Sequence, residues 1–247
     1  MWRQTPLRDD SPSPSQESAS IMSRVVFALL VVLVSSTAHA GPLTISSSVG
    51  GAPTGVAKDN LNWLPLGLTG GSNGTVTVTF TPDGGVVTGA VSGKYAAPFA
   101  SNGNGVAFGD ADGVDQSRYI STGSAKAVQG ANATMRFASA QKYFGLLWGS
   151  VDTYNSLDFY AGDALIGTVT GSNVAAVANG DQGMMGTYYV NVVSTEAFDR
   201  VVASSRGYAF EFDNIAYNTA DPGVPEPTTL ALVGLGLLGA ARRRYRR

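Results

Sequence analysis

The side chains that could carry chemistry in this 247-residue chain are mainly carboxylates. There is no cysteine, and the one histidine, His39, lies near the N-terminus beside small and apolar residues. Ser-His-Asp and Cys-His nucleophilic sites and the usual zinc sites all need these residue types. The composition therefore excludes such sites from the main part of the chain and leaves carboxylate chemistry, Ser-Lys chemistry, or no chemistry at all.

A carboxylate-only enzyme of the glycosidase kind needs just two acidic side chains that flank a sugar bond. The candidates are Asp152, Asp158, Asp163, Glu211 and Asp213. Their spacing does not show that any two converge, and Asp152 and Asp163 fall in predicted turns, where Asp commonly bonds its own backbone. We therefore predict no catalytic residue and a non-enzymatic protein, and keep a carboxylate-dependent glycoside hydrolase as the less favoured alternative.

Calcium is the one cofactor for which the sequence contains candidate ligands. The stretch "GDADGVDQSRY" brings Asp110, Asp112 and Asp115 together beside glycine. An EF-hand is excluded, because Val114 stands at its fifth ligand position and no acidic residue stands at the twelfth. A looser oxygen cage and a solvated turn both remain open, and Asp213 followed by Asn214 is a weaker candidate of the same kind.

Aromatic side chains could bind a sugar, since their faces suit the partly apolar faces of saccharides. Tyr154 lies in a predicted loop, and Tyr160 lies on the predicted outward face of a strand. Both are candidate glycan contacts. Trp148 is predicted to fill the core instead.

The central region is acidic. Between Gly41 and Glu226 there are 8 Lys and Arg against 15 Asp and Glu, a difference of −7. Nucleic-acid binding depends on basic patches that neutralise phosphates, so no nucleic-acid partner is expected.

The glycine-rich composition and the strand patterns predict the fold that must position these residues. Glycine makes up 31 residues and only 14% of the chain is charged, which favours many turns and few long helices. Residues 75–80 and 86–91 are predicted to form a hairpin, and residues 142–171 a three-stranded meander with a turn at Gly162 and Asp163. Phe210 and Phe212 are expected to point inward. The predicted fold is all-β, an antiparallel two-sheet β-sandwich of the jelly-roll type over residues 41–222, with a barrel as the alternative.

The N-terminus reads as an export signal. From Met22, Arg24 precedes an apolar run over residues 25–34, and Ala38 and Ala40 form a small-residue cleavage site. This arrangement is typical of a signal peptide over residues 22–40. Residues 1–21 are polar and rich in Pro and Ser, so they are predicted to be disordered, or to lie upstream of a true start at Met22.

The C-terminus reads as a short membrane anchor. Residues 228–241 carry no charge and would reach about 21 Å as a helix, which is short for a ~30 Å hydrocarbon core. Five arginines follow, and the positive-inside tendency places them in the cytoplasm. A short transmembrane helix with the preceding domain outside is therefore expected.

The residues Val224, Pro225, Glu226 and Pro227, followed by this apolar run and the arginines, resemble the PEP-CTERM sorting signal of Gram-negative bacteria that make extracellular polysaccharide. The resemblance implies a sorting segment over residues 223–247 that the membrane protease exosortase recognises and removes. It also implies transient residence in the inner membrane, then the cell surface or extracellular matrix, with extracellular polysaccharide or biofilm as the partner.

The stretch "YFGLLWGSVDTYN" at residues 143–155 and the later "FEFDNIAY" resemble the domain of one family of exosortase-dependent surface proteins. The similarity extends over about residues 90–217 and implies no reaction or ligand. We therefore expect a non-enzymatic surface or matrix protein, with a carbohydrate-binding module, assisted or not by calcium, as the alternative.

Overall fold

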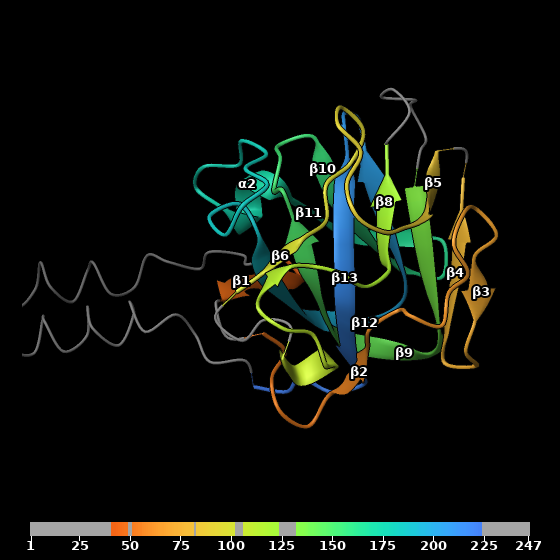
Figure 1. Cartoon of the computed structure of the whole chain (residues 1–247). Coiled ribbons are helices and arrows are strands. Elements are labelled where there is room, and N and C mark those ends of the chain that lie inside the picture. The colour runs from red at the N-terminus through yellow and green to blue at the C-terminus, as the bar shows by residue number, and fades with distance from the viewer. Residues whose placement is uncertain (1–40, 49–50, 82, 102–105, 124–131, 224–247) are drawn as a thin grey trace, which may run out of the picture. The chain divides into compact units, whose positions relative to one another are not determined.

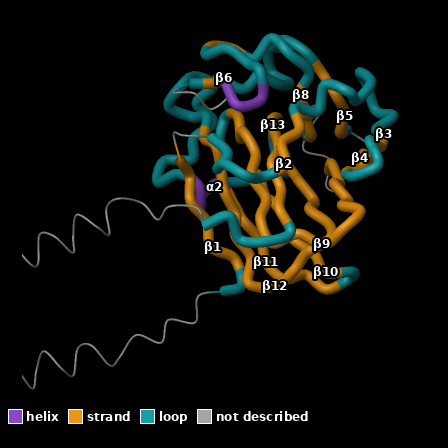
Figure 2. Tube along the Cα trace, turned by 90° about the horizontal axis from the view of Figure 1, so that it is seen from below, coloured by secondary structure: helices purple, strands orange, loops and turns teal. Residues whose placement is uncertain are grey.

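The computed structural model describes residues 41–48, 51–81, 83–101, 106–123 and 132–223. This part of the chain is almost entirely strand and loop, and Figure 2 shows how short its two helical pieces are. Every pairing between its named strands is antiparallel. The prediction of an antiparallel all-β fold is confirmed.

The elements follow one another along the chain as in Figure 1. The first five strands are β1 (Leu43–Ser48), β2 (Ala57–Asp59), β3 (Gly71–Ser72), β4 (Val76–Phe80) and β5 (Gly84–Val87). Next come β6 (Phe99–Ala100), the 3-10 helix η1 (Val106–Phe108), β7 (Gly113–Val114) and β8 (Tyr119–Thr122). The rest are β9 (Asn132–Gly149), β10 (Asn155–Ala161), β11 (Ala164–Thr170), the helix α2 (Gly171–Val174), β12 (Tyr188–Ser205) and β13 (Phe210–Asn218).

The 11-stranded sheet contains two 18-residue strands, β9 and β12, which pair with each other. The first and second halves of each strand have different further neighbours, so the sheet consists of two halves that follow one another along these strands. The first half of β9 pairs with β4 and with the end of β12, whose other neighbour is β10. The second half of β9 pairs with β13 and with the start of β12, whose other neighbour is β1. Register shifts interrupt the β9–β12 ladder between these halves, as β-bulges that bend a strand do.

The core lies between the two halves. Phe144 from the second half of β9 meets Phe159 of β10 edge to face, with ring centroids 6.0 Å apart. Trp148 is fully buried and stacks on Phe210 at 4.3 Å, as the predicted core role requires. Phe212 is also fully buried, so the inward orientation predicted for it and for Phe210 is confirmed. Stacked pairs of this kind add about 0.5–1.5 kcal/mol beyond the burial of their area.

The two halves of β9 differ in sequence pattern because they differ in what covers them. In the first half, Ala133, Met135 and Phe137 are buried and alternate with more exposed residues. From Tyr143 to Gly149 every residue is buried. A strand buried on both faces reads as a continuous apolar run, whereas a strand with one wet face alternates. Something must therefore cover the outer face of the second half.

That cover is the segment of residues 90–101 and 106–118, which we call the covering segment. Its Phe108 packs on Tyr189 of β12 with ring centroids 6.0 Å apart, inside a second apolar cluster separate from the main core. The backbone N–H of Phe99 donates to Thr187 Oγ1 at 3.2 Å. Residues of β6, within this segment, and of β13 both belong to this cluster. The polar side chains on the outer face of β13 are thereby buried.

Two predicted strand pairings are wrong, for one physical reason. The strand β4 does not pair with β5, because β4 joins the first half of β9 while β5 joins β8 in the other half. The predicted meander fails in the same way, because β12 lies between β9 and β10. Only its β10–β11 hairpin is confirmed, with Gly162 at φ 59° in the turn. In both places the chain crosses from one half to the other, where local pattern suggests a hairpin.

Several sequence predictions concern residues that the structure does not describe. The signal peptide with Ala38 and Ala40, the sorting residues 224–227 and the apolar run at 228–241 all lie outside the described residues. Within the described ranges, no helix has the length and apolar character needed to cross a membrane.

Candidate functional site

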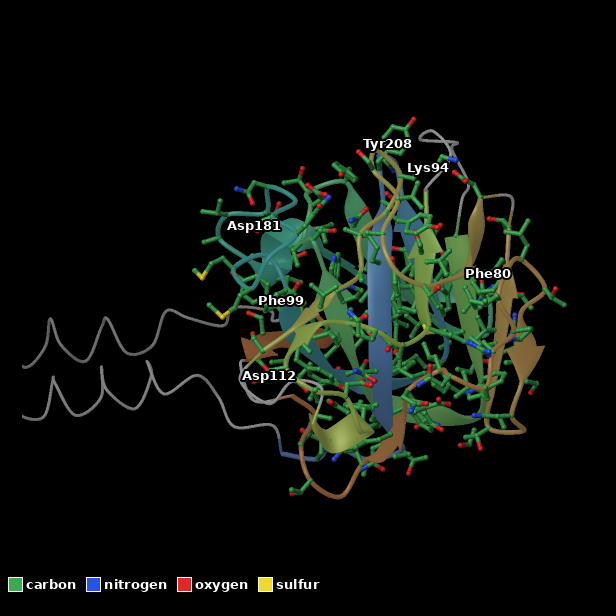
Figure 3. All side chains as sticks on the ribbon, in the orientation of Figure 1. Phe80, Lys94, Phe99, Asp112, Asp181 and Tyr208 are labelled. Carbon is green, nitrogen blue, oxygen red and sulfur yellow. The ribbon has the colours of Figure 1, made fainter. Side chains whose placement is uncertain are left out.

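A pocket of about 480 Å³ opens at the end of the molecule where Lys94 and Tyr208 lie in Figure 3. One wall is the start of the covering segment, from Ala90 to Ala96. The other lining residues come from three neighbouring loops and the start of β13: Ser150, Asp152, Tyr154, Asn179, Gly180, Gln182, Tyr208, Ala209 and Glu211. Ligand pockets typically measure about 300–1,000 Å³ and hold a few convergent polar groups, as this one does.

Glu211 forms the floor of the pocket and is only 2% exposed. Both of its carboxylate oxygens are engaged: Oε1 accepts from the backbone N–H of Ala96 at 2.9 Å, and Oε2 from Ser150 Oγ at 2.6 Å. Burial raises the pKa of Glu211, these two hydrogen bonds oppose the rise, and the charge of Asp152 adds to it. The carboxylate thus ties the covering segment and the loop after β9 to β13.

Asp152 and Tyr154 form the side of the pocket. The Tyr154 hydroxyl donates to Asp152 Oδ2 at 2.6 Å and also contacts the carbonyl oxygen of Tyr208. Burial raises the pKa of Asp152, and the hydrogen bond from Tyr154 opposes that rise. Gly180, at φ +72°, brings its backbone so close to Asp152 that an added Cβ would lie 2.8 Å from either carboxylate oxygen. A side chain at position 180 would therefore displace Asp152.

The backbone at Ser150 is strained. Its φ of 39° lies in the left-handed region, which few non-glycine residues occupy and which costs of order 1–3 kcal/mol. This conformation aims the hydroxyl at Glu211. Ser150, Asp152 and Tyr154 all belong to the stretch at residues 143–155 on which the family resemblance rests.

A second polar group lies further along β13, also beneath the covering segment. Ser117 Oγ donates to Asp213 Oδ2 at 3.3 Å, and Asn214 Nδ2 donates to Asp110 Oδ2 at 2.6 Å. Asp115 is buried beside them and accepts from the backbone N–H of Ser117 at 2.7 Å. Figure 3 shows the neighbouring Asp112 well away from Lys94 and Tyr208, so this group is separate from the pocket.

The structure brings some of the predicted site residues together and separates others. Of the five carboxylate candidates, Asp152 and Glu211 line one pocket, whereas Asp158 bonds Thr168 in the β10–β11 hairpin. Asp163 is exposed and lies 4.0 Å from Arg200.

Of the two candidate glycan contacts, Tyr154 lines the pocket. Tyr160 lies six residues further along β10, roughly 20 Å away at ~3.3 Å per residue, under the guanidinium of Arg200 at 4.2 Å. Of the candidate calcium ligands, Asp110 and Asp115 lie near Asp213, while Asp112 is exposed.

Four residues that line the pocket are not among those predicted from the sequence: Lys94, Asn179, Gln182 and Tyr208. All four come from loops, where no periodicity marks a residue as facing a site. The only sequence signals near them are turn residues, such as Asn179 followed by Gly180.

Comparison with known proteins places one segment of the chain. Among curated proteins, no sequence matches. Residues 223–247 match the family model described as the PEP-CTERM protein-sorting motif. The resemblance drawn from Val224 to Pro227 is thereby confirmed, and exosortase is the processing partner that this motif implies. The chain therefore carries an exosortase-dependent sorting signal, which marks it as an exported protein of the cell surface or extracellular space.

Proposed function

We propose that this exported domain is a non-enzymatic binding module of the cell surface or extracellular matrix, whose pocket holds a segment of extracellular polysaccharide. The observation that carries the proposal is the lining of the pocket. Tyr154 and Tyr208 supply aromatic faces, and Lys94, Asn179 and Gln182 supply donors and acceptors for sugar hydroxyl groups. Tyr208 is 46% exposed and thus accessible to a ligand at the rim.

The state of the pocket carboxylates supports binding over catalysis. Glu211 holds two internal donors, and Asp152 holds the Tyr154 hydroxyl, so both side chains have structural tasks. A carboxylate that acts on a glycosidic bond must instead face the substrate or its attacking water. The bent antiparallel sheet likewise supports the predicted two-sheet, jelly-roll-type sandwich, an architecture that binding modules share with many other proteins.

The test is a glycan array probed with the full chain, followed by titration of any bound oligosaccharide. Tyr208→Ala should weaken binding by about two- to tenfold, the range that loss of one aromatic contact gives. Tyr160→Ala is the matched control and should leave affinity unchanged, because Tyr160 lies outside the pocket. The absence of any bound glycan, or equal weakening by both variants, would count against the proposal.

The second candidate function is a carboxylate-dependent glycoside hydrolase. It is favoured by one observation: Asp152 and Glu211 line the same pocket, where burial first, and the charge of Asp152 after it, raise the pKa of Glu211, as a general acid requires. Incubating the bound oligosaccharide with the protein decides between the two functions. Hydrolysis that Glu211→Gln abolishes while binding persists would replace the first proposal by this one.

Sorting can be tested separately from binding. Deleting Pro225, Glu226 and Pro227 should leave the precursor in the inner membrane, since the motif that exosortase reads is gone. Deleting the exposed residues 219–221, a stretch of equal length just before the matched segment, is the control and should leave processing intact. Normal surface release of the first variant would contradict the role assigned to the motif.

A further inference from the structure

The polar group along β13 lies at a bulge in the strand. The β13–β9 register shifts between Asp213 and Ala216, and Asn214 has a φ of 53°. Phe212 and Ile215 both belong to the main core, so the two residues between them, Asp213 and Asn214, are the ones that the bulge displaces from the regular alternation. Both side chains bond residues of the covering segment. We call Asp110, Asp115, Asp213 and Asn214 the seam cluster.

Three oxygen atoms of the seam cluster are buried without a hydrogen-bond partner among the described residues. They are Asp115 Oδ2, Asp213 Oδ1 and Asn214 Oδ1. The three side chains are 5%, 0% and 1% exposed. More than nine in ten buried polar groups in native proteins have a partner, and an orphan costs of order 1–3 kcal/mol. All three atoms are acceptors, so what they lack is a positive charge or a donor.

Among the residues that the structure describes, no basic side chain forms an ion pair with these carboxylates. Arg118, the nearest in sequence, directs its guanidinium to the carbonyl oxygens of Asn62 and Leu64. The salt bridge found among the described residues joins Arg200 to Asp163, away from the cluster. The buried carboxyl groups of Asp115 and Asp213 also lie within hydrogen-bonding reach of each other. Burial and, after it, the charge of Asp115 raise the pKa of Asp213 well above its ordinary value.

We propose that the seam cluster is a binding site for a hard divalent cation, Ca²⁺, held by the Asp115 and Asp213 carboxylates and the Asn214 amide oxygen. Within the described residues, no three Asp, Glu, His or Cys side chains come together as a metal cage. The site therefore takes its remaining ligands from neutral oxygens, such as main-chain carbonyls, and from water. Calcium accepts six to eight such mixed oxygen ligands in flexible geometry, whereas Mg²⁺ demands a near-ideal octahedron and Zn²⁺ prefers nitrogen and sulfur.

The place of the cation gives it a structural task. It would neutralise two carboxylates, one on the covering segment and one on β13, and so fasten the segment to the sheet. The start of the same segment is the pocket wall from Ala90 to Ala96. The proposal does not depend on what the pocket binds, because every proposed calcium ligand belongs to the seam cluster.

The experiment uses the full chain in mild detergent, stripped with EDTA, desalted and titrated with CaCl₂ at pH 7. Equilibrium dialysis should show one bound calcium per chain. At a calcium concentration about a hundredfold above Kd, the melting temperature should rise by roughly 5–10 °C, the shift expected for a ligand of the native state in a domain of this size. Mg²⁺ at the same concentration should give a smaller shift.

Asp213→Asn keeps the shape of the side chain and removes one ligand charge, so it should lower calcium affinity at least tenfold. Glu196→Gln, an exposed position in β12, is the matched control and should bind as the wild type does. Should Asp213→Asn fail to fold, Asp115→Asn and the dialysis of the wild type still decide.

Two results would overturn the proposal. One is the absence of bound calcium in wild-type dialysis, which would leave Asp115 and Asp213 as a carboxyl pair that shares a proton. The other is wild-type calcium affinity in both Asp→Asn variants, which would place any bound calcium elsewhere on the chain.

Discussion

Glu211 and Asp213 stand two residues apart on β13, both buried beneath the covering segment, yet their surroundings differ. Glu211 meets a donor at each oxygen, Ala96 N–H and Ser150 O–H. Asp213 has one oxygen without a partner among the described residues and a second carboxyl group beside it. When a buried carboxylate has a donor at each oxygen, the protein itself satisfies its hydrogen bonds. A buried carboxylate that faces another carboxylate needs a proton or a cation instead.

The largest effect should come from removing the Glu211 carboxylate, which has a donor at each oxygen. Glu211→Ala leaves a buried backbone N–H and a hydroxyl without their acceptor and should lower the free energy of unfolding by about 2–4 kcal/mol. Glu211→Gln should cost less, about 1–2 kcal/mol, since it keeps one oxygen but turns an N–H₂ toward a donor. Urea unfolding measures both, and Glu196→Gln should change stability by less than about 0.5 kcal/mol. A Glu211→Gln variant as stable as the wild type would show that the donors are not matched to a carboxylate.

The same isosteric exchange at Asp213 should have the opposite sign when calcium is chelated. Asp213→Asn removes a buried charge and gives Asp115 a neighbour that can donate, so stability should stay equal or rise by about 1 kcal/mol. With saturating calcium the order should reverse, because only the wild type retains the full ligand charge. The measurement is urea unfolding with EDTA and with CaCl₂. Equal losses in EDTA for Asp213→Asn and Glu211→Gln would erase the distinction between the two residues.

The sequence could supply the class of fold and parts of the core, because these depend on local pattern. Alternation marked β4, and the turn at Gly162 and Asp163 marked the β10–β11 hairpin. Pattern could not show that β12 separates β9 from β10, since pairing is decided by which half of the bent sheet a strand joins. The candidate site could be predicted from the sequence to the same degree. Asp152 and Glu211 were candidates, but they meet only because Glu211 pairs with Gly149, just before the loop that carries Asp152.

The pH dependence of stability should give a further, smaller difference between the two residues. The pKa values of Asp213 and Glu211 are raised in the folded protein above the ordinary 3.8 and 4.5, burial being the first cause of each. The folded state therefore holds protons that the unfolded state has lost. Their stabilising contribution is full below about pH 4 and is lost as pH rises through the folded pKa values, with a slope of at most about 1.4 kcal/mol per pH unit and proton.

Melting temperatures of the EDTA-treated protein from pH 4 to pH 8 measure this loss. Calcium should flatten the profile, because the cation takes the place of the proton at Asp213, and Asp213→Asn should flatten it without calcium. Glu211→Gln should remove a different part of the slope and leave the calcium effect intact. A melting temperature that climbs steadily over the range would contradict the raised pKa values.

The smallest expected effect tests whether pocket and seam are independent. Tyr154→Phe removes one hydroxyl, which donates to Asp152 and contacts the Tyr208 carbonyl, and should cost about 1 kcal/mol in urea unfolding. Because that hydrogen bond lowers the pKa of Asp152, its loss should raise this pKa further. Calcium affinity should stay unchanged, since Tyr154 contacts no member of the seam cluster in the described structure. If Tyr154→Phe also weakened calcium binding, the covering segment would have to transmit the change between the two regions, and Glu211 and Asp213 would belong to one coupled network.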